Sequence, residues 1–281
     1  MKLLRYGPSG NESPGLLDDE GRIRDLSGIV SDIDEDTIGR TQLEKLAAID
    51  PRSLPIVKSS PRIGPPIRRV RNFIAVGLNY ADHARETNTP IPDEPVLFNK
   101  APSSVVGPDD AILLPPGSQK TDWEIELAVV ISEPAWQVTE AEAMAYVAGF
   151  TICHDVSERE YQIERGGQWT KGKSAPSFGP IGPWLVTPDE VPDVQDLAMQ
   201  LRVNGETMQC GSTRTMIFSA AFLVAYISRF MKLEPGDVIT TGTPPGVGLG
   251  MKPPQFLKPG DVVELAIDGL GRQRQEIRAY G

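Results

Sequence analysis

Five prolines within sixteen residues divide this chain more firmly than any other feature of its sequence. Proline fixes its own φ angle and lacks a backbone N–H, so a segment this dense in proline cannot continue a helix or a central strand. We therefore predict a small N-terminal α+β module with a proline-rich linker at residues 1–68, and a larger domain at residues 69–281. The prolines are Pro51, Pro55, Pro61, Pro65 and Pro66.

The two parts carry different local patterns. In the N-terminal module, LLDDEGRIRDL (16–26) predicts a hairpin and TQLEKLAAI (41–49) predicts one short helix. The larger domain has strand-like apolar runs at 72–78, 128–132, 146–155, 182–187, 197–205, 237–242 and 261–268. The sequence thus predicts a mostly β protein of the α+β class.

Three helices are expected among these strands. Thr139 with Glu142, and Ser157 with Glu160, have the spacing of a capping box, which marks a helix start. A third helix is expected at 217–231. The related stretches LEPGDVITTG (233–242) and LKPGDVVELA (257–266) contain Pro-Gly, which favours a type II turn before each strand.

Composition excludes several classes of function. The formal net charge is −10 and no Lys/Arg-rich block stands out, so we expect no nucleic-acid partner. Two cysteines are too few for a disulfide framework, which fits a reducing compartment. The start of the chain, MKLLRYGPSGNES, lacks the apolar run of a signal peptide, and no apolar run approaches the length of a membrane span. We expect a soluble, cytoplasmic protein with no membrane partner.

The stretch DWEIELAVVI (122–131) places two glutamates in an otherwise apolar strand pattern. Side chains alternate along a strand, so Glu124 and Glu126 share one face, which Ala128 and Val130 continue into the core. A half-exposed strand with two solvated glutamates is the simple alternative. A carboxylate face that runs into a core instead indicates a buried site.

A third carboxylate follows another apolar run. Asp155 ends the strand pattern of GFTICHDVSEREYQ (149–162), on the face of Cys153 and opposite to His154. It could simply cap the helix expected after it. If it meets Glu124 and Glu126, each pair of charges about 4 Å apart would repel by roughly 4 kcal/mol at an effective dielectric near 20. Such an all-oxygen set suits Mg²⁺ or Mn²⁺.

Seven motifs, taken together and in order, resemble the fumarylacetoacetate hydrolase family from about Val70 to the C-terminus. The resemblance implies a mixed β-roll catalytic domain, a homodimer, and a Mg²⁺ or Mn²⁺ site held by Glu124, Glu126 and Asp155. The motifs are VGLNYADHARE (76–86), EPVLFNKAPSS (94–104), DWEIELAVVI, HDVSEREYQ (154–162), QWTKGKS (168–174), SFGPIGPWLVT (177–187) and TTGTPPGVG (240–248).

The same resemblance implies three catalytic residues. His83 would take a proton from water while Glu86, three residues later on the same helix face, orients it. Lys173 of the GKS motif would offset negative charge near the metal. Without the resemblance, His83 and Glu86 are also explained as a surface pair on a helix.

Further residues would contact the substrate. Arg159 and Gln162 are three apart, and an Arg can hold a carboxylate by two charge-assisted hydrogen bonds. Lys100 and Thr243 match substrate-side positions of the family. On residue pattern alone, EREYQIER is also explained as a solvated helix face and TTGTPPGVG as a tight loop.

Three residues depart from the family pattern or lack a role in it. Ala101 stands where relatives carry a proline, so the match of Lys100 to the family position is less well defined. Lys171 adds a second cation beside Lys173 and has no family role, and His154 is expected to be structural.

The implied reaction is hydrolysis of a C–C bond in a 2,4-diketo acid to release pyruvate. Within the family, the chain length and N-terminal module point to sugar-acid catabolism, with 2,4-diketo-3-deoxy-L-rhamnonate giving pyruvate and L-lactate. The alternatives at the same site are acylpyruvate or fumarylpyruvate hydrolysis, oxaloacetate decarboxylation and dienedioate isomerisation. A non-catalytic metal- or ligand-binding protein is the alternative of another class, since a fold does not determine a function.

Overall fold

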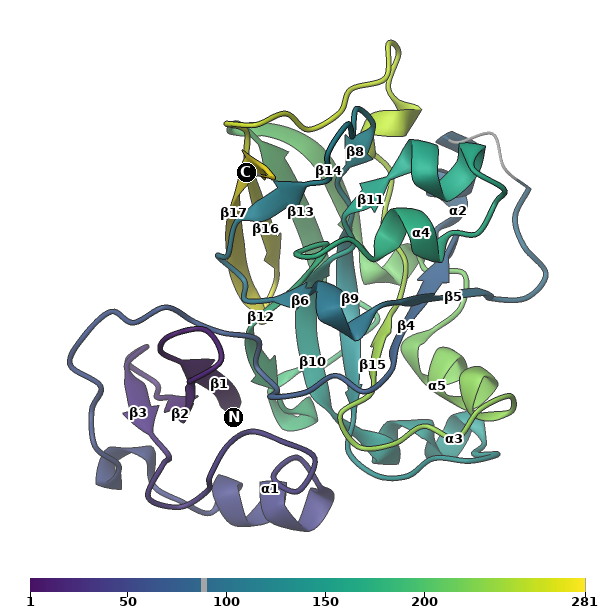
Figure 1. Ribbon diagram of the computed structural model, residues 1–281. Helices are drawn as coiled ribbons and strands as arrows, with labels where there is room; N and C mark the ends of the chain where they lie inside the picture. The colour runs from purple at the N-terminus through teal and green to yellow at the C-terminus, as the bar shows by residue number, and fades with distance from the viewer. Residues whose placement is uncertain (87–89, 281) are drawn as a thin grey trace.

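The computed structural model describes residues 1–86 and 90–280, without the side chains of residues 83 and 84. One long sheet runs through it (Figure 1). In spatial order its strands are β3 (Ile23–Asp25), β2 (Ser13–Leu17), β1 (Lys2–Tyr6), β12 (Gly179–Val186), β10 (Val147–His154), β9 (Ile125–Ile131), β15 (Val238–Thr240), β4 (Phe73–Gly77) and β5 (Val96–Lys100), with β6 (Val105–Val106) beside β12.

A second sheet and a short strand pair complete the β structure that is described. The second sheet has the order β14 (Glu206–Ser212), β13 (Ala198–Val203), β16 (Val262–Ile267), β17 (Gly271–Ala279) and β7 (Ile112–Leu114). The pair consists of β8 (Thr121–Asp122) and β11 (Ser157–Glu158). The α+β, mostly β fold expected from the sequence is confirmed.

Helices are short and lie around the sheets. They are α1 (Arg40–Ala47), α2 (Ala81–Glu86), α3 (Glu140–Ala143), α4 (Thr170–Lys173) and α5 (Ala220–Ser228). The capping box expected at the start of α3 is present, with the carboxylate of Glu142 accepting from the N–H of Thr139 at 3.1 Å. The helix expected at 217–231 is shorter at both ends. It begins at Ala220, because Ser219 caps it by accepting from the N–H of Phe222, and it ends at Ser228.

The N-terminal module is joined to the larger domain by backbone pairing. Strands β2 and β3 form the hairpin expected at 16–26, and α1 is the expected helix. Strand β1 then pairs antiparallel with β12, so the module extends the long sheet (purple in Figure 1). The proline-rich segment pairs back onto the module through isolated bridges at Ile56 and Ile63.

Strand β9 separates two apolar cores, as its alternation requires. Ile125 and Leu127 face the core between the two sheets. Ala128 and Val130 face the core that the long sheet shares with the N-terminal module. The period-two pattern of the sequence is therefore confirmed along this strand.

One predicted helix start is wrong. Ser157 does not cap a helix with Glu160, because it belongs to β11 and pairs with Asp122 of β8. A single π-helical turn begins only at Glu160, whose N–H donates to the carboxylate of Glu158 at 3.0 Å. Pairing with a strand 35 residues away in sequence outweighed the local capping signal.

Within residues 1–86 and 90–280, no helix is long and apolar enough to cross a lipid bilayer.

Candidate metal and substrate site

Three carboxylates from two neighbouring strands converge in the interior. Glu126 lies on β9 opposite Cys153 of β10, and Asp155 follows two residues after Cys153. Glu124 stands just before β9, where its C=O accepts from the N–H of Asp155 at 2.9 Å. One oxygen from each of the three carboxylates lies within 4.8 Å of the others, and all three side chains are buried.

Burial and mutual repulsion make this cluster costly without a cation. The pKa of Glu126 is raised well above its ordinary value, first by burial and then by the charges of Asp155 and Glu124. The charge of Lys173 opposes this shift, and so does a hydrogen bond from the N–H of Gly242 to the Glu126 carboxylate at 2.9 Å. The cluster therefore has the chemistry of a hard-cation site.

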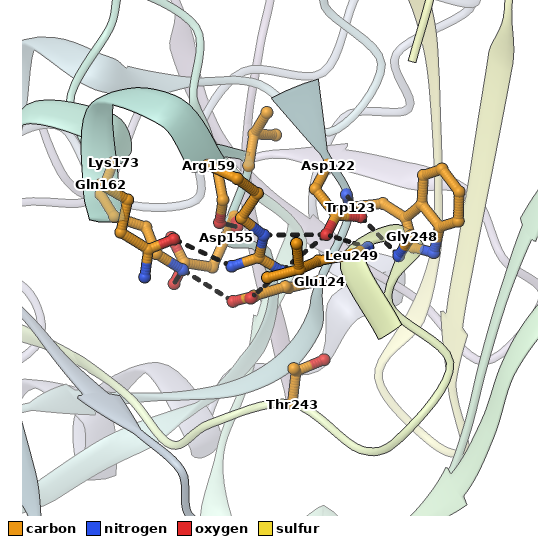
Figure 2. Close-up of polar contacts among 12 residues, drawn as sticks. Asp122, Trp123, Glu124, Asp155, Arg159, Gln162, Lys173, Thr243, Gly248 and Leu249 are labelled. Carbon is orange, nitrogen blue, oxygen red and sulfur yellow. Dashed lines mark hydrogen bonds and ion pairs between the residues drawn. The ribbon is translucent and has the colours of Figure 1, made fainter. Parts of the chain in front are cut away.

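Lys173 supplies one positive charge to the cluster. Its Nζ lies 2.7 Å from Glu124 and 2.6 Å from Asp155 (Figure 2). Burial disfavours the charged amine, but Asp155 and Glu124 outweigh burial and raise the pKa of Lys173. Helix α4 ends at this residue, so its last turn delivers the amine to the carboxylates.

Lys100 lies on the other side of Asp155. Its Nζ is 2.5 Å from Oδ1 of Asp155 and donates to the C=O of Lys173, also at 2.5 Å. The side chain is fully buried and does not line the cavity described below. In this position Lys100 holds Asp155 and the end of α4, whereas the family resemblance places it at the substrate.

Arg159 is bound by two carboxylates. Its Nε donates to Asp122 at 2.8 Å, and a terminal nitrogen pairs with Glu124 at 2.7 Å. The other terminal nitrogen donates to Oε1 of Gln162 at 3.0 Å. Arg159 and Gln162 are thus adjacent, as their spacing indicated, and Arg159 is already engaged inside the protein (Figure 2).

Thr243 lies in the loop after β15, where Gln209 ties it to β9. The hydroxyl of Thr243 donates to the C=O of Ile125 at 2.8 Å, and Nε2 of Gln209 donates to that hydroxyl at 2.8 Å. The Oε1 of Gln209 accepts from the N–H of Ile125 at 3.0 Å. This brace fixes the strand start between the two glutamates.

The proposed catalytic pair is only partly described. His83 belongs to α2, but its side chain lies outside the described residues. Glu86, at the end of α2, accepts from the N–H of Gly246 with both oxygens at 3.0 and 3.1 Å. The helix that carries His83 is therefore anchored to the loop that carries Thr243.

A cavity of about 310 Å³ opens onto the carboxylate cluster. It brings together the three carboxylates with Lys173, Arg159, Gln162 and Thr243, which were singled out from the sequence. Apolar side chains complete its lining: Val76, Leu78, Phe98, Ile163, Trp169 and Leu249.

Two supporting residues, Asp122 and Gln209, escaped the sequence interpretation. Asp122 accepts from the N–H groups of Gly248 and Leu249 at 2.7 and 3.0 Å, in addition to Arg159. The only local signal was its place beside Trp123 at the head of the glutamate strand. Gln209, 84 residues from Ile125, left no local signal.

Asp122→Asn should destabilise the protein by about 3 kcal/mol, because removing one partner of a buried ion pair leaves the charge of Arg159 undercompensated. Urea unfolding monitored by circular dichroism measures this change. Asp82→Asn, in an exposed pair with Arg85, is the control and should shift stability by less than about 1 kcal/mol. Equal stability of both variants would show that Asp122 does not hold the site together.

The family model of the fumarylacetoacetate (FAA) hydrolase C-terminal domain matches residues 72–278. A Burkholderia ambifaria protein named "Putative hydrolase" is 61% identical over 279 residues, covering 99% of both chains. Both matches extend over the whole site described above.

Solved structures agree on the fold and differ in the reactions that they name. A fumarylacetoacetate hydrolase from Exiguobacterium antarcticum is 38% identical with a TM-score of 0.89, covering 99% of each chain. A probable 2-hydroxyhepta-2,4-diene-1,7-dioate isomerase from Mycobacterium abscessus is 33% identical, with a TM-score of 0.85 and full coverage of both chains. Maleylpyruvate hydrolase from Sphingobium sp. SYK-6, in complex with manganese(II) and pyruvate, is 25% identical, with a TM-score of 0.82 and 99% coverage of each. The chain belongs to the fumarylacetoacetate hydrolase family of enzymes.

Proposed function

We propose that this protein is a divalent-metal-dependent hydrolase that cleaves a C–C bond of a 2,4-diketo acid and releases pyruvate. The observation that carries the proposal is the buried cluster of Glu124, Glu126 and Asp155 at a cavity that also contains Lys173. The manganese and pyruvate bound by the Sphingobium relative support both the metal and the product class.

The donor set fits Mg²⁺ or Mn²⁺. Three buried carboxylates offer hard oxygen ligands. Burial, and then the charges of Asp155 and Glu124, raise the pKa of Glu126, and a bound cation would offset this. Glu124, Glu126 and Asp155 would hold the ion, which when bound supplies a Lewis acid at the 2-oxo acid end of the substrate.

The protein's own residues would act around that end. Water adds to the acyl carbon, and the bond between this carbon and C3 of the substrate breaks. C3 then takes up a proton, so a 2,4-diketo acid and water give pyruvate and a second acid. His83, oriented by Glu86, would take the proton from the attacking water. The ammonium of Lys173 would stabilise negative charge as the bond breaks, and this contribution is specific to the transition state.

The substrate that we propose first is 2,4-diketo-3-deoxy-L-rhamnonate, which gives pyruvate and L-lactate in cytoplasmic L-rhamnose catabolism. Acylpyruvate or fumarylpyruvate hydrolysis, oxaloacetate decarboxylation and dienedioate isomerisation use the same cluster and are the competing reactions. Dienedioate isomerisation is included because one of the similar structures is named as a probable dienedioate isomerase.

Pyruvate release from a panel of 2,4-diketo acids, with oxaloacetate and a dienedioate included, tests the proposal. We expect hydrolysis that stops with a chelator and returns with Mg²⁺ or Mn²⁺, because three carboxylates cannot serve the reaction without the cation. Activity that survives complete metal removal would rule out metal dependence. Turnover of oxaloacetate or the dienedioate alone would assign one of the competing reactions.

We further propose a homodimer, on the family resemblance. Analytical ultracentrifugation at micromolar concentration should give about twice the chain mass of 30.6 kDa. A single species of the chain mass at all concentrations would contradict this expectation.

A further inference from the structure

The cavity at the carboxylate cluster has an apolar part that the proposed chemistry does not use. This part contains an aromatic pair, Phe98 on β5 and Trp169 just before α4, with ring centroids 5.3 Å apart and planes tilted by 59°. The Nζ of Lys173 lies 5.1 Å from the centroid of Phe98. The aromatic pair therefore begins where the charged end of the cavity stops.

Close packing against the backbone fixes this pair. A Cβ atom added to Gly77 would lie 2.4 Å from the ring of Trp169, so the indole rests directly on the backbone of β4. Gly77 itself lines the cavity. The pair is thus a preformed apolar surface, which suits recognition of a ligand group without large rearrangement.

Among the described residues at the cluster, no cation is left to pair with a second carboxylate of the substrate. Among the described lining residues the cations are Arg159 and Lys173, and each already pairs with two carboxylates. The metal-site carboxylates and Asp122 make four negative charges. Arg159, Lys173 and Lys100 make three positive charges, so the net charge of these side chains is −1. A divalent ion would turn this into one positive charge, which the carboxylate of a 2-oxo acid neutralises.

We infer that the site selects 2,4-diketo acids whose acyl group is uncharged, and that Phe98 and Trp169 form the surface that receives this group. This inference rests on the proposed function and narrows its substrate class. A second carboxylate, as in a fumaryl or maleyl group or a dienedioate, would lose its hydration against an aromatic surface with no described cation to pair with. The tail of 2,4-diketo-3-deoxy-L-rhamnonate, a hydroxyl and a methyl group, is uncharged.

Binding of unreactive 2-oxo acids tests this inference without turnover. Isothermal titration of the Mg²⁺-loaded protein would compare 2-oxohexanoate with 2-oxoadipate, which differ only in a terminal methyl or carboxylate, and with pyruvate as the common end. We expect 2-oxohexanoate to bind at least tenfold more tightly than 2-oxoadipate. It should also bind more tightly than pyruvate, by up to about fourfold for each buried methylene.

Two variants and a control locate the effect. Trp169→Ala should bring the affinity for 2-oxohexanoate to within about threefold of that for pyruvate and leave pyruvate binding unchanged. Leu249→Arg, which adds a cation to the apolar lining, should reverse the preference toward 2-oxoadipate. Trp136→Ala removes an exposed tryptophan outside this cavity and should leave all three affinities unchanged.

The outcomes separate this inference from the proposed function. If the parent protein binds pyruvate but binds 2-oxoadipate as tightly as 2-oxohexanoate, the inference is overturned and the proposed function stands. The same holds if Trp169→Ala and Leu249→Arg both retain the parent preference. Failure of pyruvate and both longer acids to bind in the presence of Mg²⁺ would overturn the proposed function, and the inference with it.

Discussion

Replacing Glu126 by Gln is expected to remove metal binding while making the metal-free protein more stable. Gln keeps the size of the side chain and the acceptor for the N–H of Gly242, but it removes a buried charge that Asp155 and Glu124 repel. Loss of an outer hydrogen-bond partner of a metal ligand costs roughly 10- to 100-fold in affinity, and loss of a ligand should cost more. Relief of repulsion, partly screened by Lys173, should add about 1–3 kcal/mol to metal-free stability.

The pH dependence of stability gives this prediction a definite sign. The ordinary pKa of a Glu carboxyl is 4.5, and that of Glu126 in the folded protein is raised. The folded state therefore holds this proton to higher pH than the unfolded state does. The resulting stability is fully present below pH 4.5 and is lost as pH rises through the folded pKa. The gain from Glu126→Gln should accordingly be largest above that pKa.

Thermal unfolding with and without Mg²⁺ at several pH values measures both effects. The parent should gain melting temperature with Mg²⁺, and Glu126→Gln should not. Glu276→Gln, at an exposed pair with Arg278, is the matched control and should behave as the parent. A Glu126→Gln protein that Mg²⁺ still stabilises would remove Glu126 from the metal site.

Local periodicity predicted the parts of the site that lie on strands or directly beside them. Alternation in DWEIELAVVI placed Glu124 and Glu126 on one face, and the structure brings both to Asp155. The prediction succeeded because β9 is buried on both faces, so each inward side chain needs either apolar neighbours or a compensating charge.

Contacts between distant segments could not be predicted in this way. Lys100 meets Asp155 across 55 residues, and Arg159 meets Asp122 across 37. Whether a lysine or arginine faces the ligand or supports a ligand-binding carboxylate depends on tertiary packing, which the spacing of residues does not encode. The same limit explains why Ser157 pairs in a strand although its spacing to Glu160 is that of a capping box.

Replacing His83 by Ala is expected to slow 2,4-diketo acid hydrolysis by 10²–10⁴-fold, with metal affinity nearly unchanged. Hydrolysis needs a nucleophilic water, and general-base help in forming it is typically worth this factor, or roughly 3–5 kcal/mol of barrier. Oxaloacetate decarboxylation requires no such water, so any decarboxylation should fall much less. The assignment of His83 comes from the family resemblance and is tested here directly.

The comparison with Glu86 distinguishes a base from a structural residue. Glu86→Gln keeps an oxygen that can accept from the N–H of Gly246, so α2 should stay anchored while the imidazole is less well oriented. Its loss of rate should therefore be smaller than that of His83→Ala. Steady-state kinetics with saturating Mg²⁺, together with metal titration of each variant, separates the two effects. Hydrolysis by His83→Ala at the parent rate would exclude His83 as the base, and another group would then have to activate the water.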